Sequence, residues 1–158
     1  EWVMMRTDWD QRSHDEELFL NEDPDPYEDG SHSPGPSTDC IDYLLGKGIV
    51  GWGTQCIGTD AGMAGKFSPP FPAHNFLHRD NCFGLASLCN LDQLPPKGAI
   101  LIATPLKIKD GTGSPIRPGS ITRSMISAGR LAACSGSSRS RAGIRTCTQA
   151  TATARRAR

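Results

Sequence analysis

The chain has 158 residues, a formal net charge of zero and 37% hydrophobic residues, which allows one domain with a buried core. No apolar run reaches the length of a signal or membrane segment, so a membrane-spanning segment is not expected. The zero charge hides an asymmetry, because ten of the seventeen acidic residues lie between Asp8 and Asp29, and eight of the seventeen basic residues follow Arg117. This distribution is typical of a chain made of unlike parts.

The six cysteines include no C-x-x-C pair and no zinc-finger spacing. Secreted disulfide scaffolds are usually shorter and carry a signal segment, so the pattern favours free thiols in a reducing compartment. We therefore expect a cytoplasmic protein. The chain begins at Glu1, which fits a partial sequence as well as a processed one.

The first predicted element is a short buried strand at residues 2–5. It leads directly into Arg6, Thr7 and Trp9, and polar and aromatic side chains at a strand end often line a pocket. Composition alone, however, favours an ordinary strand-to-loop transition here. Residues 10–36 combine many acids and prolines with few apolar residues, which predicts a long surface loop with a short turn near residues 16–20.

A helix is predicted from about residue 38, because residues 37–39 all offer capping oxygens. An apolar stripe follows at Ile41, Leu44 and Leu45, and glycine ends the helix. Residues 49–52 then read as a strand. A helix that is followed by a strand after so short a connection indicates an α/β fold.

Residues 53–70 form a predicted loop rich in glycine and proline. Gly51 and Gly53 begin like a dinucleotide-binding fingerprint, but Cys56 stands where its third glycine would be, and no helix is predicted to follow. A nucleotide site is therefore excluded. The glycines are better explained by sharp turns and close backbone approach.

A leucine pattern predicts a helical turn that two prolines end; its members are Leu85, Leu88, Leu91 and Leu94. Residues 99–103 are the most apolar run and predict a strand buried on both faces. Residues 106–109 alternate between apolar and basic side chains, which predicts that they point alternately inward and outward. Residues 110–113 are predicted to form a turn.

The segment after Arg117 has no acid and no aromatic residue, and it shows little periodicity. Such a segment cannot bury enough apolar area to offset its ordering entropy, so disorder is expected. Its arginines and serines are compatible with nucleic-acid binding through phosphates. A shifted reading frame explains the mixture better, and nucleic acid is not expected as a partner.

His74 is the strongest candidate for chemistry. A single histidine beside apolar residues is more often structural, but Pro70, Pro72 and Ala73 restrict the backbone before it and would position its ring. His78 follows four residues later, although the glutamate and third ligand of a zinc motif of that kind are not visible. A nucleophile elbow is excluded because Ser87 lacks the G-x-S-x-G context.

Three motifs carry a resemblance that spans roughly residues 2–117: PAH at 72–74, NLDQLP at 90–95, and PLKI followed by GTGSPIR within 105–117. With them, the chain resembles the C-terminal half of the cyclase family of metal-dependent hydrolases, which includes kynurenine formamidases and isatin hydrolases. The resemblance implies a β/β/α swivelling-domain fold, which would be incomplete here. It also implies hydrolysis of an aryl formamide or cyclic amide, the former being the step that forms kynurenine in tryptophan catabolism.

The same resemblance implies roles for individual residues. His74 matches the family histidine at the metal centre, as a ligand or as an acid/base, and the divalent metal would be zinc or manganese. Arg6, Thr7 and Trp9 would line the substrate pocket, and Ser87 would be a polar wall group, with a plain turn serine as the equal alternative. For the full-length parent, the resemblance implies a homo-oligomer that acts on a small amide.

Two departures from the family pattern matter. The main metal motif, HxGTHxDxPxH, is not present in this chain, so we expect that the chain alone does not hold the metal and is inactive alone. Dinuclear formamidases carry a glutamate ligand where Ala86 stands here, which favours the single-metal, isatin-hydrolase-like branch.

Three parts are therefore predicted: a strand and acidic loop at residues 1–36, the C-terminal half of a hydrolase domain at 37–117, and a disordered tail at 118–158 for which a shifted reading frame is the favoured explanation. The alternative function is a non-catalytic scaffold remnant whose basic tail binds a partner or nucleic acid.

Overall fold

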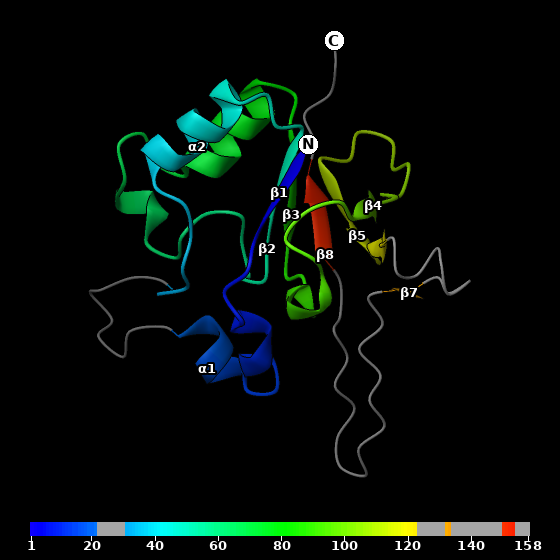
Figure 1. Cartoon of the computed structure of the whole chain (residues 1–158). Helices are drawn as coiled ribbons and strands as arrows, with labels where there is room; N and C mark the ends of the chain where they lie inside the picture. The colour runs from blue at the N-terminus through cyan, green and yellow to red at the C-terminus, as the bar shows by residue number, and fades with distance from the viewer. Residues whose placement is uncertain (22–30, 123–131, 134–149, 154–158) are drawn as a thin grey trace.

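The computed structural model describes residues 1–21, 31–122, 132–133 and 150–153, and these form two β-sheets with short helices (Figure 1). The larger sheet has the strand order β1-β2-β3-β8-β5, and the smaller one has the order β4-β6-β7. The chain is thus a mixed helix-and-strand protein, as the sequence predicted. Its assignment to the swivelling-domain type stays a prediction.

Three parallel strands form one side of the larger sheet: β1 (Trp2–Met5), β2 (Gly51–Thr54) and β3 (Phe83–Ala86). Next to β3 lies β8 (Ala150–Thr153), which is antiparallel both to β3 and to β5 (Gly113–Ile116). Because β1, β2 and β3 run in the same direction, the segments that follow them leave from one edge of the sheet.

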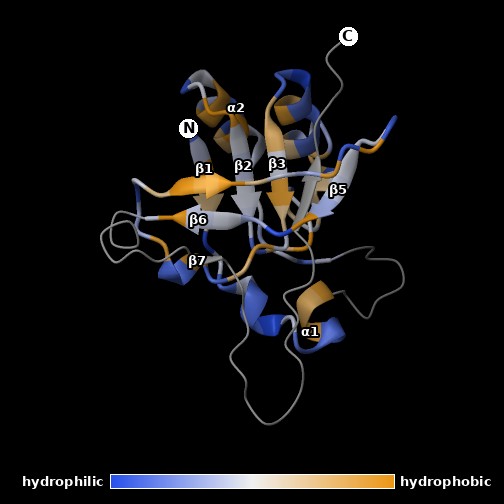
Figure 2. Cartoon of the chain, turned by 90° about the vertical axis from the view of Figure 1, so that its right-hand side faces the viewer, coloured by the Kyte–Doolittle hydropathy of each residue, from blue (hydrophilic) through white to orange (hydrophobic). Residues whose placement is uncertain are grey.

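The smaller sheet is antiparallel and consists of β4 (Ile100–Ile102), β6 (Gly119–Ile121) and β7 (Ala132–Ala133). Figure 2 shows β6 running across the direction of β2 and β3. In β4, Ile100 is 57% exposed and Ile102 is 45% exposed. The prediction that residues 99–103 form a strand buried on both faces was therefore wrong, because β4 turns only Leu101 toward the core.

Two hydrophobic clusters cover the two faces of the parallel strands. The alternation of β1 divides its side chains between them, with Val3 and Met5 in one cluster and Trp2 and Met4 in the other. The first cluster contains side chains of α2 (Thr38–Gly46) and of one π-helical turn, η3 (Ala73–Leu77). The second contains the leucines after β3 together with Ile116 of β5.

The helix α2 begins and ends as the sequence predicted. The Ser37 side chain accepts a hydrogen bond from the Cys40 N–H, and Gly48 has a positive φ of 73° after the last turn. Ile41 is fully buried in the first cluster. The short turn predicted near residues 16–20 is the helix α1 (Glu16–Leu20), which Figure 1 shows beyond the end of β1.

The leucine pattern after residue 84 was assigned to the wrong element. Leu85 lies in β3, and Leu91 begins a 3-10 turn, η4 (Leu91–Gln93), with Leu88 between them. All of them, with Leu94, nevertheless pack in the second cluster, although they do not share one helical turn as predicted.

Residues 31–35 cross closely over residues 60–62. The Gly62 N–H donates to the Ser33 carbonyl at 2.9 Å, and a Cβ added to Gly62 would lie 1.5 Å from the Ser31 carbonyl oxygen. A Cβ added to Gly35 would lie 2.0 Å from the Ala61 nitrogen. These contacts fix the loop that leaves β2.

Part of the segment predicted to be a disordered tail consists of strands, because residues 119–121, 132–133 and 150–153 are β6, β7 and β8. For those residues the prediction of disorder was wrong. The other tail residues beyond Thr122 lie outside the described part of the chain. No helix among the described residues is long and apolar enough to span a membrane.

Candidate active site

The loop that leaves β2 places Thr59 and Asp60 against the helical side of the sheet. The indole N–H of Trp52, in β2, donates to the Thr59 carbonyl at 3.1 Å. The Thr59 side chain lies over Gly84 of β3, where an added Cβ would come within 2.9 Å of its Cγ2. Thr59 and Asp60 are each only 5% exposed, so both are fixed by core packing.

Asp60 binds the start of η3. Its carboxylate accepts hydrogen bonds from the backbone N–H groups of Ala73, at 2.6 Å, and of His74, at 3.1 Å. The first N–H groups of a helical turn have no partner within the turn, so a carboxylate there satisfies them and favours the turn. Pro72 precedes them with φ −60°, which is already helical.

The same carboxylate holds the His74 ring. Asp60 Oδ2 lies 2.5 Å from His74 Nδ1, and Thr59 Oγ1 lies 3.2 Å from the same nitrogen. The hydrogen bond to Asp60 raises the pKa of His74 above its usual value, while partial burial opposes the shift and the negative charge of Asp60 adds to it. A proton on Nδ1 that faces Asp60 leaves Nε2 available for chemistry.

This arrangement suits proton transfer or metal binding through Nε2. The His74 side chain is 49% exposed, whereas that of Asp60 is 4% exposed, so a buried carboxylate orients an accessible imidazole. Histidines that bind metals usually donate their other N–H to such a carboxylate. Among the described residues, however, no three His, Cys, Asp or Glu side chains gather as a metal site would need. The described residues therefore do not fit a complete metal centre.

His78 lies next to His74 but faces it edge-on. The two rings are 5.7 Å apart between centroids at an interplanar angle of 77°. His78 Nδ1 lies 3.4 Å from the Cys82 carbonyl. In this geometry His78 packs against the His74 ring, and we assign His78 no role in catalysis or metal binding.

A second group of polar residues lies where the parallel strands end. Thr7 follows β1, and its N–H donates to the side-chain oxygen of Gln55, which follows β2. The Thr7 hydroxyl lies 3.6 Å from the Cys56 thiol, whose pKa is raised by burial. Arg6 is exposed and forms an ion pair with Asp8 at 2.7 Å.

Trp9 has a packing role in the structure. It is 9% exposed, its indole N–H donates to the Phe19 carbonyl at 2.8 Å, and the Arg12 guanidinium lies 4.0 Å from the ring centroid. The indole hydrogen bond joins α1 to the 3-10 turn η1 (Trp9–Arg12) that follows β1. A substrate-binding role for Trp9, as for Arg6 and Thr7, stays a prediction.

Ser87 directly follows β3 in a left-handed conformation, with φ 55°. Its backbone N–H donates to the Cys56 carbonyl at 2.7 Å, so this turn is joined to the segment that follows β2. The two residues are therefore held by different partners, His74 by Asp60 and Ser87 by the backbone of Cys56. The role of Ser87 as a polar wall residue of the site stays a prediction.

Sequence reasoning missed two residues that organise this region, Asp60 and Gln55. Both lie in the glycine-rich loop after β2, and no spacing or repeat distinguishes them there. The only available signal was the residue type. A carboxylate or a carboxamide that is buried must form hydrogen bonds, so either side chain in a buried loop is expected to bind other segments.

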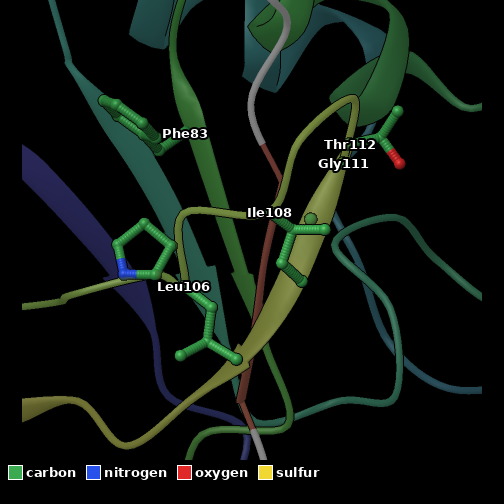
Figure 3. A pocket seen from close by; sticks show the side chains of 7 residues that line it. Phe83, Leu106, Ile108, Gly111 and Thr112 are labelled. Atoms are coloured by element: carbon green, nitrogen blue, oxygen red, sulfur yellow. The ribbon is translucent and has the colours of Figure 1, made fainter.

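A separate pocket of about 150 Å³ lies between the start of β3 and the loop before β5 (Figure 3). Its lining is apolar apart from one threonine: Phe83, Pro105, Leu106, Ile108, Gly111, Thr112 and Gly113. None of the predicted site residues lines it, and it contains no titratable group. We assign it no catalytic role.

A family model, a related protein sequence and solved structures all relate this chain to the same group of proteins. Residues 1–61 match the family model described as "Putative cyclase". An isatin hydrolase from Roseibium aggregatum is 74% identical over 117 residues, which cover 74% of this chain and 43% of that protein.

Solved structures agree with this result. An isatin hydrolase bound to the product analogue thioisatinate superposes with a TM-score of 0.72 at 68% identity, over 78% of this chain and 46% of that one. Isatin hydrolase A from Ralstonia solanacearum gives 0.70 at 44% identity, over 74% and 43%. The chain thus spans less than half the length of each of these relatives. Residues 1–61 thus match the cyclase family model, and about three quarters of the chain is similar to part of the isatin hydrolases.

Proposed function

We propose that this chain contributes His74 to the active site of a hydrolase that opens the C–N bond of a cyclic amide or an aryl formamide. The observation that carries the proposal is the pair formed by buried Asp60 and accessible His74. The high identity to an isatin hydrolase, whose name indicates a cyclic amide substrate, supports the choice of bond.

The chemistry assigned to His74 is proton transfer at Nε2. In amide hydrolysis, water adds to the carbonyl carbon and loses a proton, and the nitrogen leaves with a proton when the C–N bond breaks. An imidazole oriented through Nδ1 can accept the first proton and supply the second. Asp60 stabilises the imidazolium between the two transfers, because its charge faces the ring.

The proposal includes dependence on a divalent metal, zinc or manganese, as in the family that the sequence resembles. The described residues provide His74 but not a full ligand set, so no step is assigned to the metal here. Arg6, Thr7 and Trp9 are the proposed substrate contacts, and Ser87 is the proposed polar wall residue. The free thiols of Cys40, Cys56 and Cys82 support a cytoplasmic location.

A chimera tests the proposal. The 117-residue stretch of the Roseibium aggregatum isatin hydrolase that matches this chain would be replaced by the corresponding residues of this chain, and isatin hydrolysis would be measured with Mn²⁺ or Zn²⁺. We expect an active chimera that loses about a hundredfold or more in rate on His74→Ala, the usual contribution of a general acid or base.

His14→Ala is the matched control, because His14 is an exposed histidine of the acidic loop and should leave the rate unchanged. An active chimera in which His74→Ala costs no more than His14→Ala would overturn the role of His74. A chimera that folds but does not hydrolyse isatin would overturn the proposed activity for this stretch.

A further inference from the structure

Gln55 and Asp10 together join three loops through their side chains. Gln55 Oε1 accepts hydrogen bonds from the backbone N–H groups of Thr7, at 2.7 Å, and Asp8, at 2.9 Å, while its Nε2 donates to Asp10 Oδ1 at 2.6 Å. The second oxygen of Asp10 accepts from the Asn90 N–H at 3.0 Å. We call Gln55, Asp10 and these three backbone groups the Gln55 hub.

Only one orientation of the Gln55 amide satisfies all its partners. The oxygen must face two N–H donors, and the NH₂ group must face a carboxylate that can only accept. Gln55 is 1% exposed, so no water compensates for a lost partner. The hub therefore fixes where each of its groups lies and whether that group donates or accepts the hydrogen bond.

The hub lies where the three parallel strands end. Thr7 and Asp10 belong to the segment after β1, Gln55 follows β2 directly, and Asn90 lies four residues beyond the end of β3. In sheets with parallel strands, ligands bind outside the carboxyl ends of the strands. The hub thus joins the loops that a ligand at this edge of the sheet would contact.

The backbone around the hub requires such support. Asp8 has φ 54° and Asn90 has φ 58°, both in the left-handed region that residues other than glycine adopt at an energetic cost. The hydrogen bonds from Asp8 to Gln55 and from Asn90 to Asp10 hold these two residues in that conformation. Without them, the segment carrying Arg6 and Thr7 would relax.

We propose that Gln55 is a positioning residue for the substrate-binding edge, which sets the segment of Arg6 and Thr7 against the loop of Asn90. This inference rests on the proposed function for the identity of the edge, but it concerns a residue that acts through others and does not touch substrate. It assigns Gln55 a role that its place in a glycine-rich loop did not indicate.

The test uses the whole chain and amide hydrogen exchange measured by NMR. Gln55→Glu places two carboxylates in contact and removes the donor to Asp10, so we expect the Thr7, Asp8 and Asn90 amides to exchange about tenfold faster or more. The thermal midpoint and the exchange of the β2 and β3 amides should change far less. Gln93→Glu, at an exposed glutamine of η4, is the matched control.

The reciprocal double variant gives a rescue that a general loss of stability would not produce. Gln55→Glu with Asp10→Asn reverses the donor and the acceptor. The new amide at position 10 would donate to the new carboxylate at position 55, and the amide oxygen would accept from the Asn90 N–H. We expect exchange at Thr7 and Asn90 to return to within about threefold of the unchanged chain, as in a double-mutant cycle of contacting residues. Asp10→Asn alone, compared with exposed Asp92→Asn, provides an independent single variant should Gln55→Glu not fold.

Two results would overturn the inference: uniformly faster exchange across β2 and β3 in Gln55→Glu, or a double variant no better than its single variants. The proposed function is tested separately, by isatin hydrolysis in the chimera described above. A chimera that folds but does not hydrolyse isatin counts against the substrate assignment, while the exchange data on the whole chain still decide the role of Gln55.

Discussion

Gly84 lies directly beneath the side chain of Thr59, with no space for a methyl group between them: a Cβ on Gly84 would be 2.9 Å from Thr59 Cγ2. Thr59 in turn contacts the ring nitrogen of His74 that faces Asp60. We therefore expect Gly84→Ala to displace Thr59, lower the free energy of unfolding by about 1–3 kcal/mol and shift the NMR signals of the His74 ring.

Gly119→Ala is the control for this change. Gly119 also lies in a strand, and a Cβ there would meet no atom of the described residues within 4 Å. Chemical denaturation of both variants should show a cost only for Gly84→Ala. Equal stabilities, with an unchanged His74 ring signal, would mean that Thr59 does not connect the sheet to the candidate site.

Stability should depend on pH through His74. Its folded-state pKa is raised above the reference of 6.5, chiefly by the hydrogen bond to Asp60. A raised pKa means that the folded state binds the proton more tightly, so the stabilisation is complete below about pH 6.5 and is lost as pH rises through the folded-state pKa. Thermal unfolding in EDTA, followed from acidic to alkaline pH, measures this loss.

Asp60→Asn and His74→Gln should both remove this pH-dependent part, although Asp60→Asn will also lower stability at every pH because Asp60 binds two backbone N–H groups. The comparison therefore concerns the slope of the thermal midpoint against pH and not the midpoint at any one pH. A slope that survives in both variants would have to come from another group.

Leu77 should contribute strongly to stability, because it is fully buried in the cluster between α2 and the sheet. Leu77→Ala is expected to lower the free energy of unfolding by about 2–5 kcal/mol, through lost burial and the remaining cavity. Leu18, in α1, is 47% exposed, and Leu18→Ala should change stability by no more than about 0.5 kcal/mol. Urea denaturation gives both values, and similar costs would contradict the assigned core.

Metal binding by the chain alone should be weak. With His74 as the only predicted ligand, we expect well under one Zn²⁺ or Mn²⁺ per chain after dialysis, measured by elemental analysis of protein without a histidine tag. Near-stoichiometric metal that disappears on His74→Ala would contradict this expectation. It would show that residues outside the described part complete a site with His74, and the chain would then be tested directly for amide hydrolysis.

The elements that the sequence predicted well are those specified locally. In α2, the cap, the apolar stripe and the stop signal all lie within about a dozen residues, so no distant contact was needed to place them. The leucines near Leu85 were assigned to a helix because short apolar patterns fit either element. Pairing of β3 with β2, about thirty residues earlier in the chain, decides for the strand.

The candidate site was predictable only in part, because its residues come from segments that are distant in the sequence. Rigid residues before His74 singled it out, but Asp60 lies fourteen residues away across a loop and a turn. Nothing in the sequence says that this loop returns to the start of η3. Likewise, Gln55 acquires its partners from segments up to 48 residues away, which only the parallel order of β1 and β2 brings together.

The crossing of residues 31–35 over residues 60–62 limits which sequences this fold can accept. At position 62 any side chain would overlap a carbonyl oxygen, and at position 35 it would overlap a backbone nitrogen, neither of which can rotate away. In a library randomised at these two positions and selected for folded protein, only glycine should be recovered at either. At position 46, where an added Cβ meets nothing within 4 Å in the part of the chain that the structure describes, alanine and other residues should also survive.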